Sequence, residues 1–300
     1  MPLAPRWWKP DRFGERYAVK SGLRSAFFVW GGVNLKIVQL SDCHVSAAPN
    51  AVYRGIDPRQ TLRSLLPAVQ AWAPDLVLLT GDLAEEPSAE TYAWLRAELD
   101  PLGVPLLTLP GNHDDPALQT RAFPATALEQ PLSELRGGWE IVLLNSAAPG
   151  RISGVLSEAT LNGLEAELGG RSLPALVVLH HQPVPTGSRW IDRYPLEQPE
   201  RFWTVIDRHP RVRAVCWGHI HHDFRAWRGS VALLGAPSTA RNSLPGSSSF
   251  AADEAGPACR WLLLGSDGSL ETGLLRPAGS AFGQNQPENQ VHQDAGEGGG

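Results

Sequence analysis

The chain has 300 residues, 42% of them hydrophobic, which is enough for one α/β domain of catalytic size with short extensions. A formal net charge of -5, without any block of lysine or arginine, argues against a nucleic-acid partner or an anionic membrane surface. The three cysteines, Cys43, Cys216 and Cys259, are too few and too scattered for a disulfide framework. We therefore expect a protein of the reducing cytoplasm.

The two ends of the chain differ from the part between them. Residues 1–32 carry positive charge and then a short apolar piece, which is too short to span a bilayer and is not followed by a small-residue cleavage site. Residues 279–300 have almost no apolar side chains, so burial cannot offset the entropy cost of ordering them. We expect a flexible extension over 1–32, one domain over 33–278, a disordered tail over 279–300 and no membrane span.

Between these ends, short apolar runs alternate with helical patterns. Continuous apolar runs of this length are typical of strands buried on both faces. They lie at residues 35–40, 76–80, 104–110, 140–145, 175–180, 212–218 and 231–235. Helices are expected at residues 59–72, 88–99, 157–168 and 199–209, two of them with a serine at the N-cap. This alternation predicts an α/β layered fold.

Polar clusters follow five of the expected strands. In chain order they read SDCH, GDLAEE, GNHDD, HHQP and GHIHH. Ligands bind at the carboxyl ends of strands in open α/β sheets, so these clusters can converge on one site. The candidate side chains are Asp42, His44, Asp82, Asn112, His113, His180, His181, His219 and His221.

Carboxylate, amide oxygen and imidazole together form a mixed set of metal ligands. Such a set suits manganese, iron or zinc and is poor for calcium, and it exceeds the needs of one ion. Residues two apart in an extended segment point the same way, so we expect Asp42 and His44 to face one ion and His219 and His221 to be paired likewise. Glycines that permit sharp turns precede three of the clusters, at Gly81, Gly111 and Gly218.

Each of these histidines alone is more often a structural group than a ligand, but their joint occurrence at strand ends favours metal binding. His181 alternates away from His180, which indicates a supporting role. We expect His222 to be solvated, and Cys43 to pack in the core. Two further residues, Trp190 and Arg189, either line a substrate pocket or belong to a lid loop with a purely structural role.

The motifs SDCH, GDLAEE, GNHD, HHQP and GHIH, in this order, resemble those of the calcineurin-like binuclear metallophosphoesterases over about residues 34–275. The segments GIDPRQTLRSLL, GSRWIDRYPL, PRVRAVCWGHIHHDF and GAPSTA are similar to the bacterial class III 3′,5′-cyclic AMP phosphodiesterases. This resemblance implies a bacterial enzyme with a layered α-β-β-α sandwich, in which two mixed sheets are flanked by helices. Glu86, Asn145 and Ala240 depart from residues common in that branch, and none of them is at a ligand position.

The resemblance also implies the roles of individual residues. One ion would be held by Asp42, His44, Asp82 and His221, and the other by Asp82, Asn112, His180 and His219. The two ions would be divalent, iron or manganese before zinc, and Asp82 would bridge them. His113 would be the catalytic acid over the phosphate, with its ring oriented by Asp114. The implied substrate contacts are His44, Asp82, Asn112 and His113.

The implied reaction is the hydrolysis of 3′,5′-cyclic AMP to 5′-AMP by a metal-bridging hydroxide, which lowers a cyclic-nucleotide signal. Two alternatives stay open at this point. The same motifs serve other diesters, such as 2′,3′-cyclic nucleotides, glycerophosphodiesters and nucleotide-sugar pyrophosphates, because pocket loops select the leaving group. The chain could also be a non-catalytic scaffold on this fold. The expected partner is a small-molecule phosphodiester, and the sequence is silent on oligomeric state.

Overall fold

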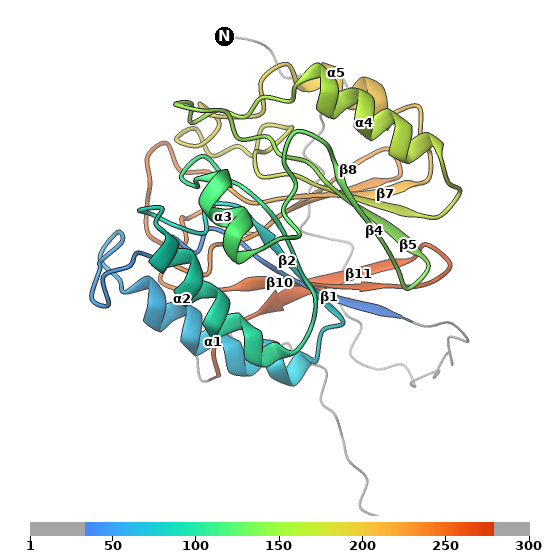
Figure 1. Cartoon of the computed structure of the whole chain (residues 1–300). Helices are drawn as coiled ribbons and strands as arrows, with labels where there is room; N and C mark the ends of the chain where they lie inside the picture. Colours follow the sequence, from blue (N-terminus) through green and yellow to red (C-terminus); the bar gives the residue numbers. More distant parts are fainter. Residues whose placement is uncertain (1–33, 279–300) are drawn as a thin grey trace, which may run out of the picture.

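The computed structural model describes residues 34–278, and Figure 1 shows its layers. Two β-sheets lie between two groups of helices, as the expected α-β-β-α sandwich requires. The extension expected over residues 1–32 and the tail expected over 279–300 lie outside the described residues. The domain bounds of 33–278 stay a prediction.

The first sheet has five strands in the order β11-β10-β1-β2-β3. Strands β1, β2 and β3 are parallel neighbours, whereas β10 pairs antiparallel with both β1 and β11. The bounds are β1 (Leu35–Leu40), β2 (Leu76–Thr80), β3 (Leu106–Leu109), β10 (Cys259–Leu264) and β11 (Leu270–Leu275).

The second sheet has six strands in the order β4-β5-β6-β7-β9-β8. Its central strands β5, β6, β7 and β9 are parallel, and each outer strand pairs antiparallel with its neighbour. The bounds are β4 (Leu132–Arg136), β5 (Trp139–Leu143), β6 (Ala175–Val178), β7 (Val212–Trp217), β8 (Phe224–Arg228) and β9 (Val231–Gly235).

Helices α1, α2 and α3 cover the first sheet, and α4 and α5 cover the second (Figure 1). Their bounds are α1 (Pro58–Trp72), α2 (Ala89–Leu99), α3 (Pro116–Ala122), α4 (Glu158–Gly169) and α5 (Pro199–Ile206), with a short 3-10 turn at Asp100–Leu102. The expected serine caps are formed, because the hydroxyls of Ser88 and Ser157 accept from backbone N–H groups in the first turns of α2 and α4. Within the described chain, every helix is too short or too polar to cross a bilayer.

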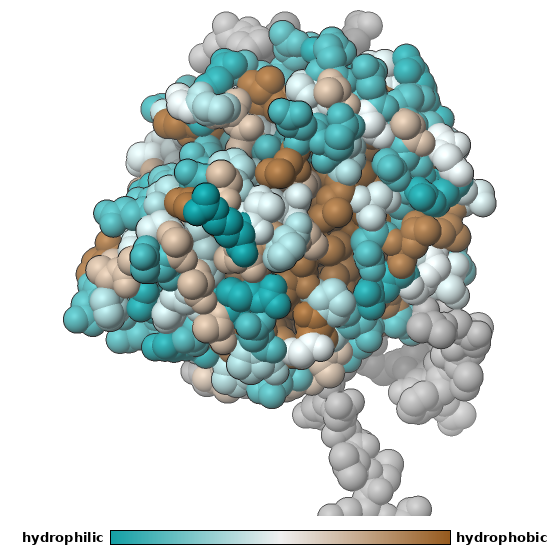
Figure 2. Space-filling view, viewed as in Figure 1, coloured by the Kyte–Doolittle hydropathy of each residue, from teal (hydrophilic) through white to brown (hydrophobic). Residues whose placement is uncertain are grey.

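Apolar side chains are buried on both faces of each sheet. In β2, Leu76 and Leu78 pack between the two sheets, whereas Val77 and Leu79 pack against the helices over the first sheet. Burial on two faces explains why these strands read as continuous apolar runs rather than as alternating ones. Figure 2 shows the consequence outside, where the surface over the helices is mostly hydrophilic and apolar side chains gather near the middle of this face.

Candidate metal centre

The five polar clusters meet at one end of the two sheets. Three of them follow β1, β2 and β3 of the first sheet, and two follow β6 and β7 of the second. Backbone hydrogen bonds join neighbouring clusters. The Asp42 N–H donates to the Gly81 carbonyl (3.0 Å), and the His44 N–H donates to the backbone carbonyl of Asp82 (3.0 Å). The Gly218 N–H donates to the backbone carbonyl of His180 (3.1 Å). The convergence expected from the sequence is therefore present in the fold.

The backbone of these clusters is not extended. Eight non-glycine residues of the described chain have positive φ, and five of them are candidate ligands: Asp42, His44, Asp82, His219 and His221. The left-handed conformation costs a non-glycine residue about 1–2 kcal/mol, so its concentration here marks a functional segment. The expectation that extended backbone would align the pairs two apart was wrong. Left-handed residues alternate with others in these clusters: Asp42 and His44 still share one group of potential ligands, whereas His219 and His221 belong to different groups.

Two glycines allow the clusters to approach closely. A Cβ on Gly218 would overlap the Ser41 hydroxyl and lie 2.9 Å from Asp42 Oδ2, and a Cβ on Gly111 would overlap the Asp82 carboxylate. Both glycines lie at the turn from strand to cluster, as their place in the motifs suggested. Any side chain there would fill the space that the carboxylates occupy.

One group of potential ligands consists of Asp42, His44 and His221, whose ligand atoms all lie within 4.8 Å of one another. His221 Nε2 lies 3.3 Å from Asp42 Oδ1 and 3.2 Å from His44 Nε2. Both histidines donate through Nδ1, His44 to Glu85 Oε2 (2.8 Å) and His221 to the Arg241 carbonyl (2.9 Å). In the neutral rings the two Nε2 lone pairs therefore face each other, which is an arrangement that a cation stabilises.

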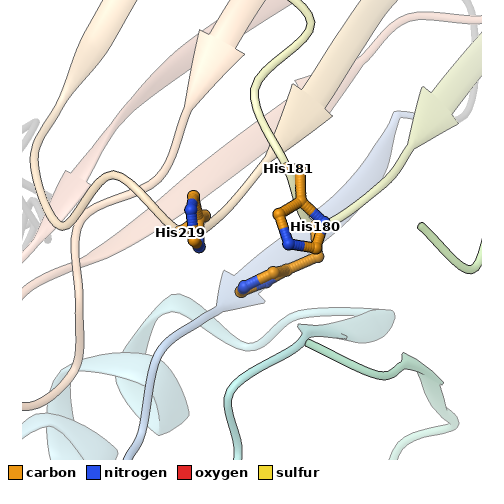
Figure 3. Close-up of side chains that lie close together, drawn as sticks. All are labelled: His180, His181 and His219. Atoms are coloured by element: carbon orange, nitrogen blue, oxygen red, sulfur yellow. The ribbon is translucent and has the colours of Figure 1, made fainter. Parts of the chain in front are cut away.

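A second group surrounds Asp82 and His180. Asp82 Oδ2 lies 3.4 Å from His180 Nε2 and 3.9 Å from His44 Nε2, so this carboxylate oxygen lies between the histidines of both groups. His219 completes this side, with its ring 5.0 Å from that of His180 (Figure 3). As in the first group, each ring has one nitrogen fixed, because His180 Nδ1 donates to the Thr80 carbonyl and His219 Nε2 to the Tyr194 carbonyl.

The two buried carboxylates of the cluster are not fully balanced by positive charge on its imidazoles. Burial alone would raise the pKa of Asp82, but the facing imidazoles, His180 first, hold that pKa well below its usual range. Burial likewise opposes ionisation of Asp42, and His221 overcomes it and lowers the pKa of that carboxyl. Burial lowers the pKa of His44 and that of His219, which disfavours the charged form of both rings. His180 differs, because Asp82 outweighs burial and raises its pKa to about 9.

The donor set fits a centre with divalent metal ions. His180 Nε2 and Asn112 Oδ1 are buried and have no hydrogen-bond partner among the described residues, although buried polar atoms are nearly always satisfied. Two buried carboxylates and four imidazoles with one fixed nitrogen each are the donors that iron, manganese and zinc accept. The six carboxylate and imidazole candidates thus lie in one cluster, Asn112 follows Gly111 at its edge, and the individual assignments remain a proposal.

The surroundings of His113 differ from those expected. Its backbone N–H donates to Asp82 Oδ1 (2.9 Å), and its ring Nδ1 lies 3.3 Å from Glu85 Oε2. Asp114 forms no hydrogen bond with that ring in the described structure. Its carboxylate accepts from backbone N–H groups of the two clusters, at Leu83, Ala84 and Gly111, and from the Tyr92 hydroxyl. Asp114 therefore fastens the loops to each other.

Glu85 is the carboxylate next to the His113 ring, and the sequence did not lead us to predict it. It contacts both His44 and His113, and these three residues form a further group of potential ligands. The sequence contained one signal for it, an acidic pair at the end of GDLAEE, but only the loop conformation separates Glu85 from the exposed Glu86.

The remaining candidates have structural surroundings. Both ring nitrogens of His181 are used, since Nδ1 bonds with Ser146 Oγ (2.8 Å) and Nε2 with the Ile152 carbonyl (2.9 Å), which suits the supporting role expected for it. His222 is only 3% exposed, so the expectation that it is solvated was wrong. All three cysteines are free and buried.

The late segment GAPSTA supports the site from the second sheet. The Ser238 hydroxyl donates to the carbonyl of Asp42 (2.7 Å), and the Thr239 N–H donates to the carbonyl of Ser41 (3.0 Å). Neither residue offers a ligand atom to the cluster. They fix the loop that carries Asp42 and His44.

Residues 35–223 match the calcineurin-like phosphoesterase family, and the chain belongs to that family. The fold of this family uses a binuclear metal centre, in agreement with the two groups of ligands described above. The chain is thus a phosphodiester hydrolase of the metallophosphoesterase type.

Relatives of known name cover most of the chain. The 3′,5′-cyclic adenosine monophosphate phosphodiesterase CpdA of Pseudomonas aeruginosa is 38% identical over 80% of this chain and 89% of that protein. A 3′,5′-cyclic-nucleotide phosphodiesterase of Nostoc sp. is 35% identical over 81% and 92%, and CpdA of Escherichia coli K12 is 32% identical over 84% and 93%.

Solved structures share the fold at low sequence identity. A dimetal phosphatase from Danio rerio superimposes with a TM-score of 0.60 at 14% identity, covering 81% of this chain and 99% of that one. A purple acid phosphatase from yellow lupin has a TM-score of 0.53 at 14% identity and covers 82% of this chain and 54% of that one. These likenesses bear out the sandwich fold.

Proposed function

We propose that the protein hydrolyses 3′,5′-cyclic AMP to 5′-AMP with the help of two divalent metal ions. The observation that carries the proposal is the cluster of buried, pre-oriented carboxylates and imidazoles next to a partly exposed histidine, His113. The choice of substrate is supported by the names of the relatives, which match this chain over four fifths of its length. The small-molecule partner and the reaction class follow from the same proposal.

The ligand assignment is that implied by the motifs. Asp82 Oδ2 lies between the two groups and would contact both ions. Iron or manganese suits the mixed nitrogen and oxygen donors, and zinc is the alternative. When bound, such ions activate a water molecule and neutralise charge on the phosphate. The first ion would be held by Asp42, His44, Asp82 and His221, and the second by Asp82, Asn112, His180 and His219.

His113 is placed to assist the leaving group. Its ring Nδ1 faces Glu85 and its side chain is 37% exposed, so Nε2 remains available on the open side of the cluster. In hydrolysis, water forms a new bond to phosphorus while the bond from phosphorus to the 3′ oxygen breaks. That oxygen needs a proton or a strong hydrogen bond, which the Nε2–H of His113 would donate. Glu85 would accept from Nδ1–H and orient the ring, so donation from Nε2 uses the ring protonated on both nitrogens.

The test is a comparison of phosphodiesters with the full chain loaded with manganese or iron. We expect the highest kcat/KM for 3′,5′-cyclic AMP, with 5′-AMP as the product and two metal ions per chain by elemental analysis. Turnover of 2′,3′-cyclic nucleotides, glycerophosphodiesters or nucleotide-sugar pyrophosphates without turnover of 3′,5′-cyclic AMP would overturn the substrate. A folded, metal-loaded protein that cleaves none of them would be a scaffold. The cytoplasmic location expected above stays a prediction.

A further inference from the structure

A group of aromatic side chains borders the metal cluster on the side of His44 and His221. The Tyr53 ring stacks on the His44 ring, with centroids 4.1 Å apart and planes 8° apart. The Trp190 ring lies edge-on to the His221 ring at 6.3 Å. Tyr53 is 8% exposed and Trp190 is half-buried, so the group begins at the ligands and continues toward the surface.

Two further residues extend this group outward. The half-buried Phe250 packs edge-on against Trp190, with centroids 5.4 Å apart. The exposed Arg54 lies with its guanidinium 4.0 Å above the Phe250 ring and donates from Nε to the Tyr53 hydroxyl (2.9 Å). We call these four residues, Tyr53, Arg54, Trp190 and Phe250, the aromatic rim.

The backbone presents Tyr53 and Arg54 in a fixed way. Tyr53 and Ile56 exchange two backbone hydrogen bonds, of 2.9 and 3.0 Å, around a two-residue turn. Arg54 and Gly55 both have positive φ, 47° and 84°, which defines a type I′ turn. Arginine is strained in this conformation, so its presence there favours a role for its side chain rather than for the turn itself.

The loops that carry Trp190 and Phe250 are hydrogen-bonded to each other and to the loop that carries His221. The Ser188 hydroxyl, two residues before Trp190, accepts from the Gly246 N–H (2.9 Å). The Ser243 N–H donates to the carbonyl of His221 (2.8 Å). The rim is therefore assembled from three distant segments and held in register with the metal cluster.

We propose that the aromatic rim binds the nucleobase of the substrate and so selects cyclic nucleotides over diesters that lack a base. This inference rests on the proposed function, since it assumes a nucleotide whose phosphate lies at the metal cluster. Nucleobases stack on aromatic rings and on guanidinium planes, and every base offers such a face. The rim supplies both kinds of surface at one edge of the site.

The test compares two substrates that differ only in the base: 3′,5′-cyclic AMP and the methyl riboside 3′,5′-cyclic phosphate, which has no base. We expect Trp190→Ala and Phe250→Ala to raise KM for cyclic AMP about ten-fold, with kcat changed less than about two-fold. The KM for the base-free diester should stay within about two-fold. Trp227→Ala is the matched control, because Trp227 is 57% exposed on the edge strand β8, and it should change neither KM.

The outcomes separate this inference from the proposed function. An equal rise of KM for both substrates, or no rise for either in the well-folded Phe250→Ala variant, would overturn the aromatic rim as a base site. If the unaltered enzyme cleaves other diesters but not cyclic AMP, the proposed function fails. The rim is then tested by inhibition of that activity: we expect 5′-AMP to inhibit more strongly than ribose 5-phosphate, and equal inhibition would overturn the rim.

Discussion

The two sheets contribute different chemistry to the same site. Loops of the five-stranded sheet supply both carboxylates, the amide oxygen and one imidazole: Asp42, Asp82, Asn112 and His44. Loops of the six-stranded sheet supply only imidazoles: His180, His219 and His221. The negative charge thus comes from one sheet and most of the nitrogen donors from the other. Neither sheet alone carries a full set of ligands, so the site forms only where the two sheets pack together.

The largest effect should follow the loss of the shared carboxylate. Asp82→Ala removes the oxygen that lies between both groups of histidines. We expect kcat/KM to fall about 10³-fold or more, because bound metal contributes several kcal/mol to transition-state stabilisation. Elemental analysis should show metal loss at the same time. Retention of both ions and of activity would contradict the central position of Asp82.

Loss of the proton donor should spare the metal. His113→Ala removes a ring that faces the cluster without belonging to either expected ligand set. We expect kcat to fall about 10²- to 10³-fold, as is usual for a general acid, while metal content stays unchanged. Unaltered turnover would refute the role of His113, and metal loss would make it a ligand.

The contact between the sheets can be perturbed at Gly218. A Cβ there would overlap the Ser41 hydroxyl and approach Asp42, which joins a loop of the second sheet to a loop of the first. We expect Gly218→Ala to lower the free energy of unfolding by about 1–3 kcal/mol in urea denaturation and to reduce metal content. Gly170→Ala is the control, because its nearest new contact would be an ordinary 3.4 Å, and its stability should change by less than about 0.5 kcal/mol.

The smallest effect on activity should follow a change at Glu85, the carboxylate that supports His44. Glu85→Gln removes the charge that faces His44 and His113 but keeps the size of the side chain. We expect kcat/KM to fall about ten-fold, the lower end of the range for groups that orient metal ligands. The neighbouring Glu86 is exposed, and Glu86→Gln should leave activity unchanged. Equal effects of the two substitutions would contradict the role of Glu85.

The sequence predicts the central strands and the ligand clusters well, for a physical reason. Strands buried on both faces must be apolar throughout, and a crowd of polar residues directly after them has no structural use. The edge strands β4 and β8 were not predicted, because LSELR and FRAWR alternate and stay partly exposed. The short helix α3 and strands β10 and β11 were also not predicted.

Details of the site depended on conformations that the sequence does not encode locally. Asp42 and His44 were expected to point together through extended backbone, yet both are left-handed. Asp114 was assigned to the ring of His113 because of its position in GNHD, whereas the loop turns its carboxylate toward backbone N–H groups. Long-range contacts decide which acidic residue reaches a histidine, and those contacts exist only in the folded chain.

The first group of ligands joins residues that are 177 positions apart, as His44 and His221 show. A chain that ended between residues 181 and 218 would contain both carboxylates but lack two of the imidazoles, His219 and His221. The full set of candidate ligands therefore exists only once synthesis has passed His221.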